Sequence, residues 1–241
     1  MLKLHKIAVL ILISFSLVSS LSAQVKKMQN NPNYDDKPFH LGFTLGFNSL
    51  SYKLIPSKDF LLQDSIYKME VKKFPGFNLG MVTNLRISEH WDLRMLPGMI
   101  FGERIIVFSE KVGGGKLNPV LENYEMHMPS IYLDVPLLIK YKATRINNYR
   151  PYVVGGASFK YDLETIRENK DNEGYTLKIN PLDYFYEIGI GIDFYMSFFK
   201  FSTELKLSNG LSNINNPENI AHSRAIDQLK SKCIMLSLHF E

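Results

Sequence analysis

The sequence predicts an all-β fold, an eight-stranded antiparallel transmembrane β-barrel of an outer membrane with short periplasmic turns and long external loops. Apolar residues recur at every second position in eight segments, and the apolar parity of these segments carries no Asp, Glu, Lys or Arg. Each segment is at or near the ~9–11 residues that a tilted strand needs to cross a bilayer. The segments are 39–47, 77–87, 91–101, 131–141, 151–161, 184–194, 199–207 and 234–240.

The connections between these segments alternate in length. Three are short (88–90, 142–148 and 196–197), and four are long and polar (50–75, 103–129, 162–182 and 208–231). An even number of strands with short turns at one end is the layout of outer-membrane barrels, and it places both chain ends on the periplasmic side. Pro97 and Pro136 fall inside strand patterns, where each lacks an N–H for the ladder, so we expect local bulges there.

The strands of a soluble β-sheet would also alternate apolar and polar residues, because one face of such a sheet is buried and the other is exposed to solvent. Here the polar parity is rich in glycine, which suits the interior of a narrow barrel: Gly42, Gly46, Gly80, Gly98, Gly102, Gly156, Gly189 and Gly191. Aromatic residues lie near strand ends, as at membrane interfaces: Phe39, Trp91, Tyr141, Tyr184, Phe199 and Phe240. We expect outer-membrane lipid to contact the apolar face, and the barrel-insertion machinery to read the C-terminal strand.

The N-terminal segment has the features of a secretory signal. Residues 1–23 carry Lys3 and Lys6 near their start and continue with an apolar core and small residues, so we expect cleavage between Ala23 and Gln24. The apolar core has about 12 residues, fewer than the ~20 that a membrane-spanning helix needs. Residues 24–38 are polar and contain proline, and they are expected to form a short flexible periplasmic arm before the barrel at 39–241.

Composition excludes several classes of function. The net charge of +4 provides no strongly basic surface for nucleic acid. The only cysteine, Cys233, can form no intrachain disulfide, and metal sites built from several cysteines are excluded. We expect no cofactor.

Charged residues of both signs occupy the alternate strand positions that are expected to face the barrel interior. An isolated buried ion costs several kcal/mol, so these charges are expected to pair and fill a narrow lumen. A selectivity lining or a proton path is the alternative. The predicted lumen charges are Arg86, Asp92, Arg94, Asp134, Lys140, Lys160, Asp162, Glu187, Asp193, Lys200, Glu204 and Lys206.

Two groups of residues are weak candidates for catalysis. Asp134 and Glu187 are carboxylates that could act as acid and base, but nothing in their spacing distinguishes them from residues that pair in the lumen, and we favour lumen pairing. Glu125, His127 and Ser130 lie near the outer end of one strand, as the polar residues of membrane-embedded hydrolases do. The chain contains neither G-x-S-x-G nor H-E-x-x-H.

Other single features have simple structural explanations. If the barrel closes, His40 and His239 should meet at the periplasmic rim, where hydrogen bonding is expected and a third metal ligand is not evident. Cys233 is expected to be an inert lumen residue. Gly113–Gly115 should form a loop tip, because no phosphate-loop lysine follows.

Several stretches, taken in order, make the sequence similar to the PorT (SprT) family of outer-membrane barrels. They are FHLGFTLGFN (39–48), PGFNLG (75–80), NLRISEHWDLR (84–94), LPGMIFGER (96–104), LDVPLLIKY (133–141), RPYVVGG (150–156) and FKFSTELKLS (199–208). The resemblance runs nearly end to end. It implies a part in the type IX secretion and gliding-motility apparatus, with other proteins of that machinery as partners, and it supplies no catalytic or cofactor residues.

Three functions remain as hypotheses. The first is a non-enzymatic barrel that serves type IX protein secretion or assembly of that machinery through its loops, its rim or the arm. The second is a small porin or a purely structural barrel. The third, a membrane-embedded hydrolase using His127 and Ser130, has the least support in the sequence.

Overall fold

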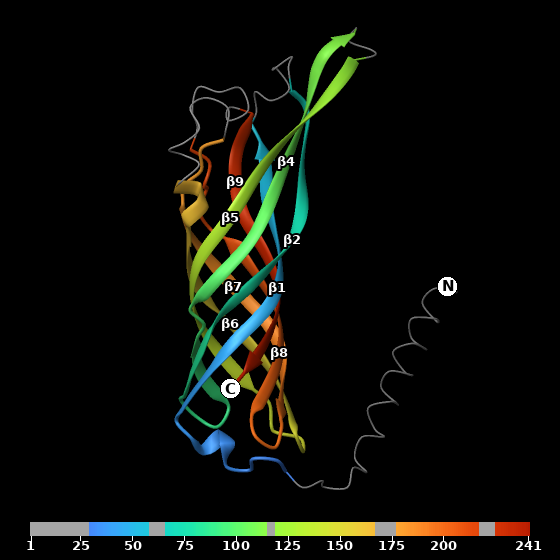
Figure 1. Ribbon diagram of the computed structural model, residues 1–241. Helices are drawn as coiled ribbons and strands as arrows, with labels where there is room; N and C mark the ends of the chain where they lie inside the picture. Colours follow the sequence, from blue (N-terminus) through green and yellow to red (C-terminus); the bar gives the residue numbers. More distant parts are fainter. Residues whose placement is uncertain (1–28, 58–65, 115–118, 167–176, 217–224) are drawn as a thin grey trace, which may run out of the picture.

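Nine strand segments form one antiparallel sheet that closes on itself (Figure 1). The computed structural model describes residues 29–57, 66–114, 119–166, 177–216 and 225–241, so the signal segment and the Ala23–Gln24 cleavage site lie outside the described residues. The segments are β1 (Phe39–Pro56), β2 (Ile66–Arg86), β3 (Trp91–Met95), β4 (Gly98–Gly114), β5 (Pro119–Lys142), β6 (Tyr149–Asp162), β7 (Leu182–Tyr195), β8 (Lys200–Gly210) and β9 (Ile226–Phe240).

The nine segments make a ring of eight strands. β3 and β4 both pair with β2 on one side and with β5 on the other, so they are two halves of one strand. The first and last strands pair with each other and close the ring. The predicted eight-stranded antiparallel barrel is therefore confirmed. Among the described residues, none of the helices has the length and hydropathy of a membrane-spanning helix.

The predicted bulges at the two prolines are wrong. Met95 pairs with Thr83 and Gly98 with Gly80, so the register is unchanged across the break between β3 and β4. The Pro97 carbonyl accepts a hydrogen bond from the Met81 N–H at 2.9 Å. The Pro136 carbonyl similarly accepts one from the Leu96 N–H at 3.3 Å. The prolines remove donors from the ladder, but their carbonyls still bridge it and hold the register.

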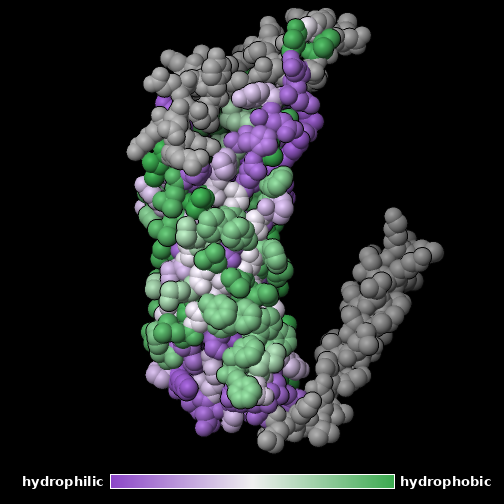
Figure 2. Space-filling model, in the orientation of Figure 1, coloured by the Kyte–Doolittle hydropathy of each residue, from purple (hydrophilic) through white to green (hydrophobic). Residues whose placement is uncertain are grey.

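The outward face carries the apolar belt. Leu41 is 57% exposed and Phe47 70% exposed, although both lie in the middle of a regular sheet. The outward positions of β1 from Phe39 to Phe47 cover roughly 20 Å of height at ~3.3 Å per residue and a tilt of ~40°, close to the ~25 Å band of such barrels. Figure 2 shows the apolar residues over the middle of the barrel, with hydrophilic residues gathered at its ends.

Aromatic pairs mark both edges of this belt. At the end with the short turns, here called the turn end, Trp91 and Tyr141 lie 4.8 Å apart between ring centroids. Phe159 and Tyr184 meet edge to face at 5.8 Å toward the opposite end, here called the loop end. The turn end is the periplasmic end in outer-membrane barrels.

Five strands are clearly longer at the loop end than the sequence pattern predicts, including β1, which continues to Pro56, and β9, which begins at Ile226. Residues 66–76, 103–114 and 119–130 continue β2, β4 and β5, and the β4–β5 hairpin rises above the barrel (Figure 1). The expectation that these stretches are loops is wrong. Their exposed positions include Lys68, Glu70 and Lys72 in place of lipid-facing apolar residues, so the two-residue apolar period stops where the membrane stops.

Candidate functional site

Charged side chains fill the lumen of the barrel. Eleven of the twelve predicted lumen charges are buried: Asp92, Arg94, Asp134, Lys140, Lys160, Asp162, Glu187, Asp193, Lys200, Glu204 and Lys206. Arg86 differs, because it lies at the turn-end rim with its side chain 26% exposed and 3.3 Å from Asp36. The lumen is thus lined by the residues that the alternation in the sequence assigns to the barrel interior.

A four-residue cluster occupies the middle of the lumen. The Lys160 ammonium lies 2.9 Å from Asp134 and 2.8 Å from Glu187. The second oxygen of Glu187 lies 2.8 Å from Lys206. The Ser208 hydroxyl also donates to Glu187 at 2.9 Å. Both carboxylates considered as an acid–base pair are therefore held by lysines, which is the arrangement of a structural ion-pair cluster.

One ion pair joins opposite walls of the barrel. The Arg94 guanidinium on β3 lies 3.3 Å from Glu204 on β8, four strands away around the ring. Arg94 also lies 2.9 Å from Glu241, which in turn lies 2.8 Å from Lys200. The Tyr152 hydroxyl donates to Glu204 at 3.0 Å. Because these side chains meet across the axis, they obstruct the lumen at this level.

Further pairs line the walls beside this crossing. Lys140 lies 2.7 Å from Asp193, whose other oxygen accepts a hydrogen bond from Ser202 at 2.6 Å. Lys142 lies 2.6 Å from Asp92.

Several lumen charges were missed at the sequence level. They are Arg104, Lys142, Arg150, Asp183 and Glu241, all inside the barrel ends and all buried or paired there. Arg104 illustrates the cause: its strand was expected to end at 101, yet the guanidinium lies 3.1 Å from Asp162 and 4.2 Å from the centroid of the Tyr52 ring. Continuing the alternation of each predicted strand by two to four residues would have assigned most of these charged residues to the lumen.

A segment before the first strand closes the turn end. Residues 29–38 include a short 3-10 helix, η2 (Tyr34–Asp36), which lies beneath the barrel in Figure 1. The Tyr34 ring stacks on His40 with centroids 4.5 Å apart. Asp35 accepts a hydrogen bond from the Tyr195 hydroxyl at 2.7 Å and lies 3.0 Å from Arg150.

These contacts differ from the flexible arm that the sequence predicts for 24–38. The described part of the segment is held by side chains of the turn end, including Asn148, whose side-chain oxygen Oδ1 accepts a hydrogen bond from the Asn30 N–H at 2.8 Å. Burial raises the pKa of Tyr34 to about 12. We call residues 29–38 the turn-end cap.

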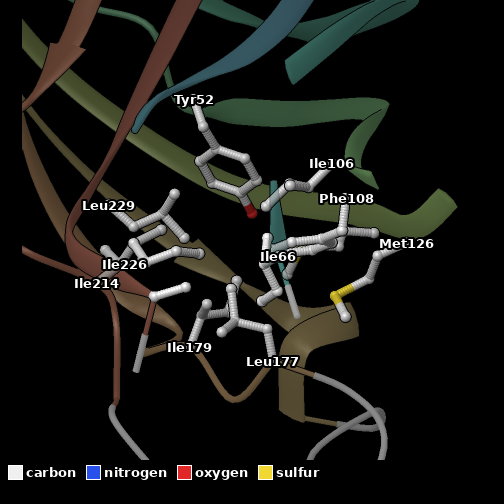
Figure 3. Close-up of a cluster of buried hydrophobic side chains, with 12 residues drawn as sticks. Tyr52, Ile66, Ile106, Phe108, Met126, Leu177, Ile179, Ile214, Ile226 and Leu229 are labelled. Carbon is white, nitrogen blue, oxygen red and sulfur yellow. The ribbon is translucent and has the colours of Figure 1, made fainter. Parts of the chain in front are cut away.

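An apolar cluster closes the loop end (Figure 3). Its side chains come both from strands and from the segments between strands, and most are under 5% exposed. We call this cluster the loop-end cap; its members are Tyr52, Ile66, Ile106, Phe108, Met126, Met128, Leu177, Ile179, Ile214, Ala225, Ile226 and Leu229.

Two small cavities lie between the caps. A cavity of about 20 Å³ lies beside Thr44, Asn78 and Asp134, and one of about 10 Å³ lies beside Leu50 and Cys233. The first has room for about one water molecule. Cys233 packs here in a small apolar cluster, as expected for an inert lumen residue.

The candidate hydrolase residues do not form a catalytic group. His127 faces outward, where its Nδ1 atom lies 2.6 Å from Glu103. Glu125 lies 2.5 Å from Lys72, whose hydrogen bond lowers the pKa of this carboxyl group. Ser130 is buried in the lumen and accepts a hydrogen bond from Arg104. A nucleophile and its base must be in hydrogen-bonding reach, and the sheet separates these two.

The predicted meeting of two histidines at the rim is wrong. The strands close with a stagger, so His239 pairs with Thr44, while His40 pairs with Asn84. Such a stagger is required to close a tilted sheet into a barrel. His40 contacts the carbonyl oxygen of Tyr34 at 2.9 Å, and His239 lies 3.5 Å from Glu204. Within the described ranges, no group of three or more His, Cys, Asp or Glu side chains could hold a metal ion.

The glycine run is at the tip of the β4–β5 hairpin. Gly113 pairs with Val120 and Gly114 with Pro119, while residue 115 lies outside the described residues. This position agrees with a hairpin tip rather than a phosphate-binding loop.

Three solved structures are similar to this chain. OprG from Pseudomonas aeruginosa has 13% identity and a TM-score of 0.43 over 90% of this chain and 96% of that chain. Ail of Yersinia pestis, in complex with the heparin analogue sucrose octasulfate, has 14% identity and a TM-score of 0.39 over 85% of this chain and 99% of that chain. Neisserial surface protein A has 9% identity and a TM-score of 0.39 over 82% of this chain and 95% of that chain.

A search of curated proteins found no match to the chain. Residues 23–216, more than half of the sequence, match the family model described as the outer membrane protein beta-barrel domain. The closed ring of eight strands and the outward apolar belt agree with that match. The chain belongs to the outer membrane protein β-barrel domain family, and it is a β-barrel of the outer membrane.

Proposed function

We propose that this chain is a closed, non-enzymatic barrel that serves protein secretion by the type IX secretion and gliding-motility machinery, or assembly of that machinery. The observation that carries the proposal is the filled lumen. Arg94 and Glu204 meet across the axis at 3.3 Å, and a cap lies at each end. A barrel of this kind acts through its surfaces rather than by conducting solutes.

The assignment to type IX secretion rests on the ordered resemblance of the sequence stretches to the PorT family. The barrel adds a surface suited to a partner, the β4–β5 hairpin that rises above the belt (Figure 1). Val112, Val120 and Tyr124 on this hairpin are 63%, 61% and 45% exposed. Apolar side chains exposed beyond the membrane favour contact with another protein.

The proposal is tested by deleting the gene in the native cell and measuring export of cargo proteins that carry the C-terminal secretion signal. We expect export to stop and to return when the wild-type gene is supplied in trans. Unchanged export after deletion would exclude the proposal.

Partner contact is tested by photo-crosslinking in intact cells. A photoreactive residue at position 124 should capture a protein of the secretion machinery. The matched control is the same residue at position 190, which replaces the exposed Ile190 within the apolar belt and should capture lipid alone. Equal capture patterns at both positions would contradict a role for the hairpin.

A further inference from the structure

A pocket of about 620 Å³ opens beside the loop-end ends of β1, β8 and β9. Lys53, Lys73, Lys230 and Lys232 line it, together with Tyr186 and Asn209. No Asp or Glu is among the described residues that line the pocket. It is therefore a strongly basic site, and the buried residues Tyr52 and Ser231 also line it.

Three of the four pocket lysines, Lys53, Lys230 and Lys232, face outward, and Lys73 is exposed. Lys230 pairs with Lys53 in the ladder between β9 and β1, and Lys232 pairs with Ser51. These positions lie on the same face of the sheet as Leu236, which is 48% exposed on the apolar belt. Like charges placed directly opposite each other in a sheet are destabilising, so Lys53 and Lys230 favour an anion between or beside them.

Among the described residues, the pocket lysines differ from those of the lumen in having no acidic partner. Lys140, Lys160 and Lys206 each lie within 3 Å of a carboxylate. In the described part of the chain, no carboxylate forms an ion pair with any of the four pocket lysines. Their charge is thus left for a ligand to neutralise.

The position of the pocket indicates the kind of ligand. On β9 the outward side chains are apolar from Phe240 to Ile234, and the next two, Lys232 and Lys230, are basic. On β8 the change from Leu207 to Asn209 falls at the same edge, because Asn209 pairs with Lys232. This edge is where hydrocarbon gives way to lipid head groups at the loop end.

We propose that the pocket binds the phosphate-bearing head group of an outer-leaflet lipid, whose acyl chains lie along the apolar side chains next to it. The lysines supply the charge that phosphate needs, and their apolar stems can lie against the acyl chains. Tyr186 completes the site as an amphipathic ring at the interface.

The test compares three proteins in uncharged detergent micelles: the wild type, the pocket variant Lys230→Gln/Lys232→Gln, and the control variant Lys68→Gln/Lys72→Gln. The control removes the same charge from loop-end lysines that are paired with Glu70 and Glu125 outside the pocket. The probe is a labelled bisphosphorylated acylated disaccharide lipid, and binding is measured by fluorescence titration. Heat-dependent mobility on SDS gels verifies that each protein is folded.

We expect the wild type and the control to bind the phosphorylated lipid alike, and the pocket variant to bind it about tenfold or more weakly. Raising the salt concentration should reduce the difference in lipid affinity between the wild type and the pocket variant, because salt screens the lysine charges. The same lipid without phosphates should bind all three proteins equally and weakly. Equal affinity of the folded pocket variant and the wild type for the phosphorylated lipid would overturn the proposal. Displacement of the lipid by an equal concentration of inorganic phosphate would also overturn it, because the site would then be one for a free anion.

Discussion

The two halves of the lumen are closed by opposite kinds of chemistry. From the turn end to the middle, ion pairs such as Arg94–Glu204 and Lys160–Glu187 fill the interior. At the loop end, apolar side chains such as Phe108 and Leu229, both 0% exposed, fill it. The polar half lies within the height of the apolar belt, and the apolar cap lies at the end where the strands extend beyond this belt.

The difference follows from where the filling residues are anchored. Strands supply the polar half, because alternate positions of a membrane-crossing strand must face inward. Eight of the twelve members of the apolar cap lie on the loop-end parts of strands, and four come from segments between strands: Leu177, Ile179, Ile214 and Ala225. Such segments can fold over the barrel mouth and bury apolar surface as in a soluble protein. The barrel is therefore closed by charge pairing inside the membrane and by hydrophobic packing outside it.

The largest predicted effect is that of Glu187→Ala in the polar half. Removing this carboxylate leaves Lys206 without its partner at 2.8 Å and Lys160 with Asp134 alone. We expect a loss of about 3–5 kcal/mol in the free energy of unfolding, since an unpaired charge would stay buried. Urea unfolding in lipid vesicles measures it. Glu187→Gln keeps a hydrogen-bond acceptor for Ser208 and should lose less; equal losses for the two variants would contradict the importance of the charge.

The next effect is that of Leu229→Ala in the loop-end cap. The side chain is fully buried among apolar neighbours, so its truncation should cost about 2–3 kcal/mol. Because Leu229 and Glu187 share no partner, the loss in the double variant should equal the sum of the single losses within ~0.5 kcal/mol. A clear departure from additivity in the same unfolding assay would mean that the two halves are one unit.

The sequence predicts the polar half better than the cap, for a physical reason. Lipid forces a strict two-residue alternation on each strand, and that alternation assigns Asp134, Lys160 and Glu187 to the interior. No such rule acts beyond the membrane, so the extensions of β2, β4 and β5 and the members of the cap had no periodic signal. The stagger that separates His40 from His239 depends on how the ring closes, which alternation in single strands does not encode.

A smaller effect is expected where a glycine makes room for a lumen ring. A Cβ atom on Gly191 would lie 2.3 Å from the Tyr152 ring, which also donates to Glu204. Gly191→Ala should therefore cost about 1–3 kcal/mol in the polar half. Gly155→Ala is the matched control, since its nearest neighbour would be 3.9 Å away. Similar unfolding curves for both variants would show that the ring does not need the space.

The smallest predicted effect concerns the turn-end cap at high pH. The docked Tyr34 has a pKa raised by burial from 10.0 to about 12, so it keeps its proton at pH values where an undocked tyrosine loses it. The contribution of Tyr34 to docking of the cap should consequently be constant below pH 10 and be lost between about pH 10 and 12. The absorbance difference between the wild type and Tyr34→Phe, titrated at 295 nm, should have its midpoint near 12. A midpoint at 10 would mean that the cap is undocked in solution.

Conductance in a planar bilayer tests the central claim, the closed lumen, most directly. The account predicts that the purified wild-type barrel, once inserted, gives no steady single-channel current, because ion pairs cross the axis and a cap covers each end. A steady ohmic conductance from the folded wild-type protein would contradict it.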